Sequence, residues 1–112
     1  MARRVLVQCA AYDKQGRLLT VQTNDYERSS RMMRFFAKMV NDPYRLVDHA
    51  EIRAIDHVRK RRKKVAKLIV TRYNKQGELV NAKPCEVCQA AIAFYKISEV
   101  EYSTDAGIFE RL

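Results

Sequence analysis

Two short motifs, far apart in the chain, constrain its fold more than any other feature. The first is His49-Ala50-Glu51, and the second, 36 residues after that histidine, is Pro84-Cys85-Glu86-Val87-Cys88. Histidine and cysteine side chains are the usual protein ligands of zinc. If both motifs bind one ion, the fold must bring two separate helix starts face to face.

The spacing of Cys85 and Cys88 places both sulfurs on the first turn of a helix. Pro84 suits the first helical position, because the N–H that proline lacks has no partner there. A helix N-terminus also favours negative charge and so lowers the pKa of a thiol. With His49 on the first turn of another helix, three ligands would hold zinc and leave a fourth position open to water, as in catalytic zinc sites.

Glu51 lies roughly 200° around a regular helix from His49, so we expect it outside the ligand set but near enough to move protons. Alternatives remain open at this point. Asp48 and Glu51 have the spacing of a capping box, in which Glu51 would only bind backbone N–H groups. The two cysteines alone could form a redox pair or half of a structural zinc site. The accompanying H-x-E motif disfavours a redox pair. The lack of a fourth well-placed ligand disfavours structural zinc, because Cys9 is expected to be a buried inert thiol and His57 a surface residue.

The apolar patterns predict a single α/β domain over residues 1–112, with a mixed sheet of about five strands and helices on both faces, in three layers. Strands are predicted at 4–12, at about 17–23, at 67–73 and around Val100 and Tyr102, with 107–112 as a fifth, and a short extended piece is predicted near 78–81. Helices are predicted at 28–40, from Asp48 to the basic run, and from Pro84.

The helix at 28–40 is expected to begin after Ser29 or Ser30 and to bury an apolar stripe. That stripe consists of Met32, Phe36, Met39 and Val40. The buried side of the helix that follows Asp48 is expected to be Ala50, Ala54, Ile55 and Val58.

The formal net charge is +9, and six of the positive charges lie in the run Arg59–Lys64. At a helix end such a run complements the helix dipole, and this interpretation is favoured, because no second basic patch with aromatics accompanies it. The alternative is that the run binds single-stranded nucleic acid. The residues that would do so are Arg59, Arg61, Arg62, Lys63 and Lys64.

No apolar run of about 18 residues is present, so we expect no membrane segment. Three cysteines without a secretory signal favour a metal site over a disulfide framework. The expectation is therefore a soluble, cytoplasmic protein.

With the combined motif H-x-E and P-C-x-x-C, the chain resembles the zinc-dependent cytidine and deoxycytidylate deaminase superfamily, and in particular the short deaminase-like proteins of phages. The similarity runs from the first hairpin to Ser103 and includes residues 74–92. The resemblance implies the cytidine-deaminase-like fold, with His49, Cys85 and Cys88 as ligands of Zn²⁺ and Glu51 as the proton shuttle. It also implies a homo-oligomer, and the host cytoplasm if the protein is phage-encoded.

Asn24, at the end of the second predicted strand, falls where many family members have an asparagine that hydrogen-bonds the sugar or base. Ala50 and Pro84 are included with it as candidate substrate-binding residues. Two departures from the family are visible. Many relatives have a helix before the first strand, and here the helix at 28–40 is expected to cover that face. Relatives that act on free nucleotides often have Ser, Thr or Glu where this chain has Lys83.

The prediction is a zinc-dependent hydrolytic deaminase that acts on a cytosine-type base of a free nucleoside or nucleotide and releases ammonia. One alternative is the same chemistry on a base in single-stranded DNA or RNA, which the basic run, Lys83 and the six tyrosines would support. The other is a non-catalytic interaction protein that keeps zinc only for stability.

Overall fold

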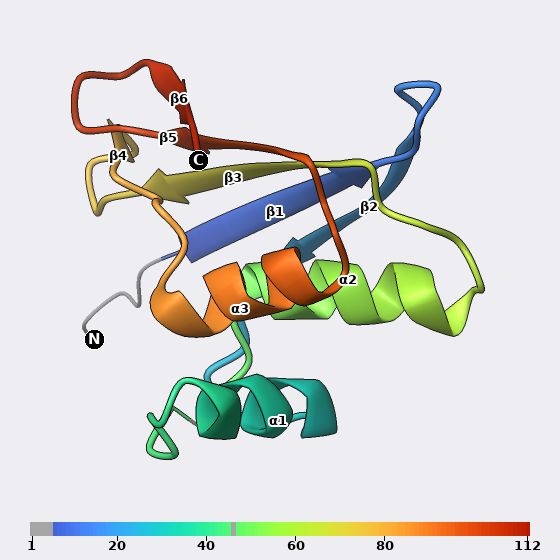
Figure 1. Ribbon diagram of the computed structural model, residues 1–112. Coiled ribbons are helices and arrows are strands. Elements are labelled where there is room, and N and C mark those ends of the chain that lie inside the picture. The colour runs from blue at the N-terminus through green and yellow to red at the C-terminus, as the bar shows by residue number, and fades with distance from the viewer. Residues whose placement is uncertain (1–5, 46) are drawn as a thin grey trace.

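The computed structural model describes residues 6–45 and 47–112 and folds them into a sheet covered by helices (Figure 1). The strands are β1 Leu6–Tyr12, β2 Leu18–Thr23, β3 Lys67–Tyr73, β4 Leu79–Val80, β5 Glu99–Ser103 and β6 Phe109–Arg111. The helices are α1 Arg31–Met39, α2 Ala50–Lys60 and α3 Glu86–Phe94. The predicted order of elements is confirmed, although the start of the first strand, predicted at residue 4, lies outside the described residues.

The predicted α/β fold with a mixed sheet is confirmed. The strand order is β2-β1-β3-β5-β6, and the short β4 pairs with the end of β3. Only β3 and β5 run parallel, and α3 lies in the connection between them; every other pair among the described strands is antiparallel. The β3–β5 crossover delivers the start of α3, with its two cysteines, to the helix-covered face of the sheet.

The helices lie on one side of the sheet, which differs from the expected arrangement on both faces. Figure 1 shows α2 and α3 side by side beneath the sheet and α1 beyond them, so the three layers are the sheet, α2 with α3, and α1. The helix expected to cover the second face therefore does not reach the sheet. The reason is aromatic packing: the Phe36 ring in α1 lies edge-on to Phe94 and Tyr95 at the end of α3, with centroids 5.4 and 5.8 Å apart.

This position also changes which residues of α1 are buried. Of the predicted stripe only Phe36 is fully buried; Met39 is 50% exposed, and Met33 and Ala37 form the buried side with Phe36. The stripe was predicted for a helix that faces the sheet, whereas α1 turns its apolar side toward α3. The N-cap prediction is confirmed, because the Ser30 hydroxyl accepts a hydrogen bond from the Met33 N–H at 3.1 Å.

The core between the sheet and α2 agrees with the sequence. Ala50, Ala54, Ile55 and Val58 are all buried, as predicted. Cys9 of β1 is 0% exposed, and burial, with the Glu51 carboxylate nearby, raises the pKa of its thiol well above the usual value. Cys9 is therefore the inert buried thiol that was expected. No helix in the described part of the chain has the length and apolar character that a bilayer crossing needs.

Candidate metal centre

The two helix starts face each other beneath the sheet, as the spaced motifs require. His49 is the N-cap residue of α2, Cys85 is the N-cap residue of α3, and Cys88 lies in the first turn of α3. Pro84 therefore precedes the cap and is not the first helical residue, contrary to the prediction. Cys85 instead has the extended backbone of an N-cap, with φ −73° and ψ 173°.

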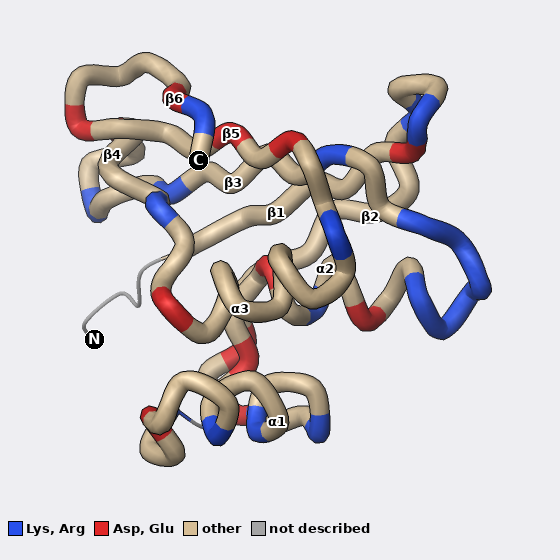
Figure 2. Tube along the Cα trace, in the orientation of Figure 1, with Lys and Arg blue, Asp and Glu red and all other residues tan. Residues whose placement is uncertain are grey.

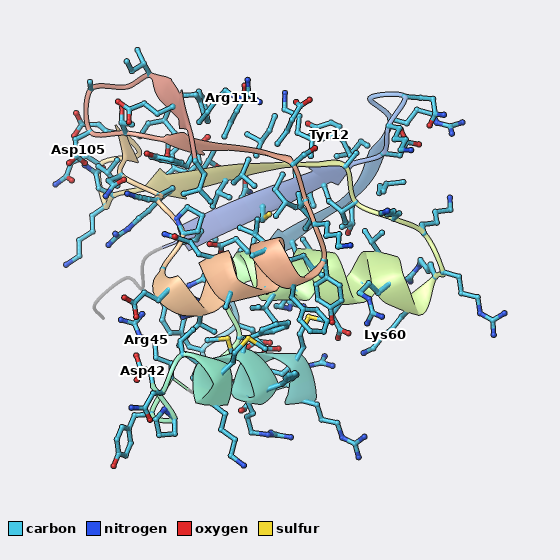
Figure 3. All side chains as sticks on the ribbon, viewed as in Figure 1. Tyr12, Asp42, Arg45, Lys60, Asp105 and Arg111 are labelled. Atoms are coloured by element: carbon cyan, nitrogen blue, oxygen red, sulfur yellow. The ribbon has the colours of Figure 1, made fainter. Side chains whose placement is uncertain are left out.

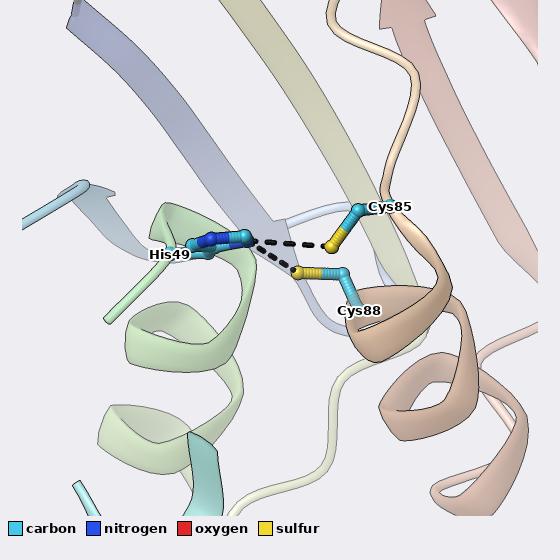
Figure 4. A group of neighbouring side chains, drawn as sticks. All are labelled: His49, Cys85 and Cys88. Carbon is cyan, nitrogen blue, oxygen red and sulfur yellow. Dashed lines mark hydrogen bonds between the residues drawn. The ribbon is translucent and has the colours of Figure 1, made fainter. Parts of the chain in front are cut away.

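The three side chains converge on one point (Figure 4). His49 Nδ1 lies 3.4 Å from Cys85 Sγ and 3.4 Å from Cys88 Sγ. In a tetrahedral zinc site, bonds of about 2.0 Å to nitrogen and about 2.3 Å to sulfur place those atoms roughly 3.5 Å apart. All three ligand atoms lie within 4.8 Å of one another. The group thus fits a zinc ion without rearrangement of the backbone.

The protonation of this group also suits a metal. A hydrogen bond from the Cys88 thiol, and a second from His49, lower the pKa of Cys85 to about 3, so its sulfur is a thiolate at neutral pH. The same hydrogen bond to Cys85, together with burial, raises the pKa of Cys88 well above its usual value. The bond to Cys85 raises the pKa of His49. The Cys85 sulfur is therefore already anionic, as a metal ligand must be. Binding of a metal ion would displace the proton of Cys88.

Glu51 lies in the first turn of α2 with its side chain 5% exposed. Burial raises the pKa of its carboxyl group, which lies beside the Cys88 thiol. The capping box of Asp48 and Glu51, which was the alternative role for Glu51, is not formed. The cap position belongs to His49, and Asp48 Oδ1 accepts a hydrogen bond from the Ser30 N–H at 2.8 Å, in a different segment.

A cavity of about 280 Å³ opens beside the three ligands. Of the candidate metal, catalytic and substrate-binding residues, it is lined by His49, Cys85, Glu51, Asn24 and Ala50. Two hydrogen bonds hold Asn24 against β1. Its side-chain Oδ1 accepts from the Val7 N–H at 3.1 Å, and its backbone N–H donates to the Val7 carbonyl at 3.2 Å. Pro84, the remaining candidate for substrate contact, does not line this cavity.

Sequence reasoning missed several residues of the cavity wall, among them Tyr26 and Arg72. Tyr26 follows Asn24 by two residues, in the segment where the Asp25 N–H donates to the Asp48 carbonyl at 2.9 Å. Arg72 stands at the end of the alternating row of β3, after the buried Leu68 and Val70. The sequence predicted this strand, but it could not predict that Arg72 borders a cavity.

The basic run lies at the other end of α2, roughly 16 Å along the helix from His49. Figure 2 shows it as the long blue segment after α2, and Figure 3 places Lys60 at that end. Part of the run is structural. The Arg59 guanidinium lies 4.5 Å from the centre of the Tyr95 ring, and Arg61 donates to the His57 carbonyl at 3.1 Å near the end of the helix.

Comparison with known proteins gives one match. A family model described as the cytidine and deoxycytidylate deaminase zinc-binding region matches residues 2–104. The matched segment contains both helix starts and the cavity between them. No curated protein and no solved structure matches the chain.

Proposed function

Because the chain belongs to the cytidine and deoxycytidylate deaminase family, we propose that it hydrolytically deaminates a cytosine-type base of a free nucleoside or nucleotide. The observation that carries this proposal is the meeting of a metal-binding group and a buried carboxylate in one cavity. Neither a redox pair nor a purely structural zinc site would need Glu51 in that place.

In this proposal His49, Cys85 and Cys88 hold the zinc ion. Bound there, zinc supplies a Lewis acid that makes water nucleophilic near neutral pH. Two thiolates and a neutral imidazole balance its charge of two. These three ligands also fix the relative positions of the two helix starts, so the cavity wall keeps its shape.

Glu51 moves the protons. Its carboxylate accepts a proton from the attacking water and delivers it to the ring nitrogen of the base. It then takes the remaining proton from the added hydroxyl and passes it to the amine, which leaves as ammonia while the carbonyl forms. Burial raises the pKa of Glu51, and a carboxyl group with a raised pKa exchanges protons more readily near neutral pH.

The cavity supports a small substrate. Its volume of about 280 Å³ lies just below the range for drug-sized small-molecule sites, which begins at ~300 Å³. Asn24 is fixed by its hydrogen bonds to Val7 and in this proposal contacts the sugar or base. Ala50 forms the part of the cavity wall between His49 and Glu51.

The direct test is ammonia release from cytidine, deoxycytidine and their monophosphates by zinc-loaded protein. We expect turnover on at least one of these substrates, with the corresponding uracil compound as the second product detected by mass spectrometry. If none of the four is converted by protein that contains stoichiometric zinc, the proposed activity is wrong.

A second candidate, deamination of a base in single-stranded nucleic acid, is favoured by one observation. A groove of about 110 Å³ follows α2 from Asp48, which also borders the cavity, to Arg61 in the basic run. Arg28 and Arg53 line this groove as well. The groove therefore connects the basic run with the edge of the metal-site cavity at Asp48.

This candidate predicts that oligonucleotides bind in a strongly salt-dependent way. Exchange of Arg61, Arg62, Lys63 and Lys64 for serine is then expected to weaken oligonucleotide binding by at least roughly ten-fold in low salt, and to flatten its salt dependence. Fluorescence anisotropy with a labelled single strand measures both. Binding that is absent, or unchanged by salt and by the exchange, removes this candidate.

A further inference from the structure

The mouth of the metal-site cavity carries two cations that take no part in the proposed deamination. They are Arg72, near the end of β3, and Lys83, in the segment between β4 and α3. Both side chains are exposed, and both line the same cavity as His49, Cys85 and Glu51. Figure 1 shows that the end of β3, β4 and the segment leading to α3 lie together at one end of the sheet.

The strand alternation directs Arg72 to the side of the sheet where the site lies. Residues 68, 70 and 72 share one face of β3, and Leu68 and Val70 are buried beneath the helices on that face. In the neighbouring strand Arg72 pairs with Val7, which also borders the cavity. Arg72 therefore lies on the same face of β3 as the buried Leu68 and Val70, at the edge of the core where the cavity opens.

One buried residue, Ser103, fixes the backbone that carries both cations. Its hydroxyl accepts from the Arg72 N–H at 3.2 Å and donates to the Val80 carbonyl at 2.7 Å, and its own carbonyl accepts from the Ala82 N–H at 2.9 Å. Lys83 follows directly, with its N–H donating to Asn81 Oδ1 at 3.1 Å. The two cations therefore project from a rigid frame rather than from a loose loop.

Neither cation is neutralised by a carboxylate in the described part of the chain. The acidic groups of the cavity are engaged elsewhere: Asp48 with the Ser30 N–H and, at 3.7 Å, with Arg28, and Glu51 with the metal-binding group. Asp105, labelled in Figure 3, accepts from the Asn81 N–H at 2.9 Å. The cavity therefore has a positive mouth and a metal-binding, carboxylate-bearing inner end.

From this arrangement we propose that Arg72 and Lys83 bind the phosphate of a nucleoside monophosphate whose base lies at the metal-binding end. The inference rests on the proposed deamination and names its substrate class. A phosphate dianion matches two cations, and an arginine offers it paired N–H donors. The small volume of the cavity favours a single nucleotide over a chain.

The test compares binding of deoxycytidine with that of its monophosphate, in zinc-loaded Glu51→Gln protein so that neither ligand is consumed. We expect the monophosphate to bind roughly ten- to a hundred-fold more tightly, because charge-assisted hydrogen bonds to phosphate are strong. Arg72→Ala and Lys83→Ala should each remove most of that difference, and inorganic phosphate should compete with the monophosphate but only weakly with the nucleoside.

Two controls sharpen the comparison. Lys38→Ala removes an exposed lysine in α1, outside the cavity, and should keep the full preference for the monophosphate. Arg72→Lys keeps the charge but loses the paired donors, so it should retain part of the preference. Circular dichroism and zinc content confirm that each variant is folded and loaded.

Three results would overturn the inference: equal affinity for the two ligands, equal weakening of both ligands by the variants, or tighter binding of a short cytosine-containing oligonucleotide than of the monophosphate. Failure of the proposed function looks different. If wild-type protein converts no substrate while the monophosphate preference still depends on both cations, deamination is wrong and the phosphate subsite stands. If the nucleoside and the monophosphate are deaminated equally well, deamination stands and the subsite is wrong.

Discussion

Glu51→Gln is expected to lower the deamination rate by about 10²–10⁴-fold or more, because glutamine has nearly the shape of glutamate but cannot accept and return a proton. Zinc content should not change, since Glu51 is outside the group formed by His49, Cys85 and Cys88. Steady-state ammonia release and elemental analysis of the same preparations measure the two quantities.

The same variant separates the enzyme from a non-catalytic zinc protein. Replacing the buried carboxyl of Glu51 by a neutral amide should leave the melting temperature within a few degrees of wild type. The matched control is Asp56→Asn, which alters a half-buried carboxylate of α2 that pairs with Lys60 at 3.1 Å, outside the cavity. This control should retain activity. Equal function of wild type and Glu51→Gln would show that Glu51 is not the proton shuttle.

Cys88→Ser is expected to abolish zinc binding and activity together. Its sulfur lies 3.4 Å from His49 Nδ1 in a fully buried position, and a serine hydroxyl stays protonated near neutral pH and is a poor zinc ligand. Zinc content should fall from about one ion per chain to near zero. The melting temperature should fall as well, because an ion that binds only the folded state stabilises it.

Cys9→Ala is the matched control for that experiment. It also removes a fully buried thiol, but one outside the metal-binding group. We expect a loss of about 1 kcal/mol in stability, with zinc stoichiometry and turnover retained. Removal of zinc from wild type by a chelator should reproduce the Cys88→Ser phenotype and should be reversed by added zinc. A zinc content in Cys88→Ser equal to that of wild type would exclude the ligand set.

The sequence predicted the elements and the metal-binding group because both depend on local spacing. Alternation of apolar residues identified β1, β-branched and aromatic residues identified β3, helical periodicity identified α2, and the spacing of Cys85 and Cys88 indicated a helix start. Errors appeared where a packing partner decides the outcome. The buried side of α1 shifted to Met33 and Ala37 because α1 packs against α3 and not against the sheet.

The residues of the cavity likewise fall into those that the sequence identified and those that only the structure placed there. His49, Glu51 and the two cysteines could be named from their motifs, because each is close in sequence to another member of its motif. Arg72 could not be assigned to the site, because it belongs to no local pattern that points to a ligand. Lys83 directly precedes the second motif, but the sequence indicated it only as a departure from the family and as support for nucleic-acid binding. Their common frame consists of hydrogen bonds to Ser103, which is 31 residues from Arg72, and no local spacing encodes such a contact.

The sequence by itself thus determined the chemistry available to this protein: a nitrogen, two sulfurs and a carboxylate at two helix starts. The tertiary structure alone decided the side of the sheet on which the helices lie, the release of Asp48 from the cap of α2, and the meeting of β3 and the β4–α3 segment at a positively charged mouth. Side-chain type and short-range spacing are written in the chain, whereas packing depends on which distant surfaces bury each other most completely.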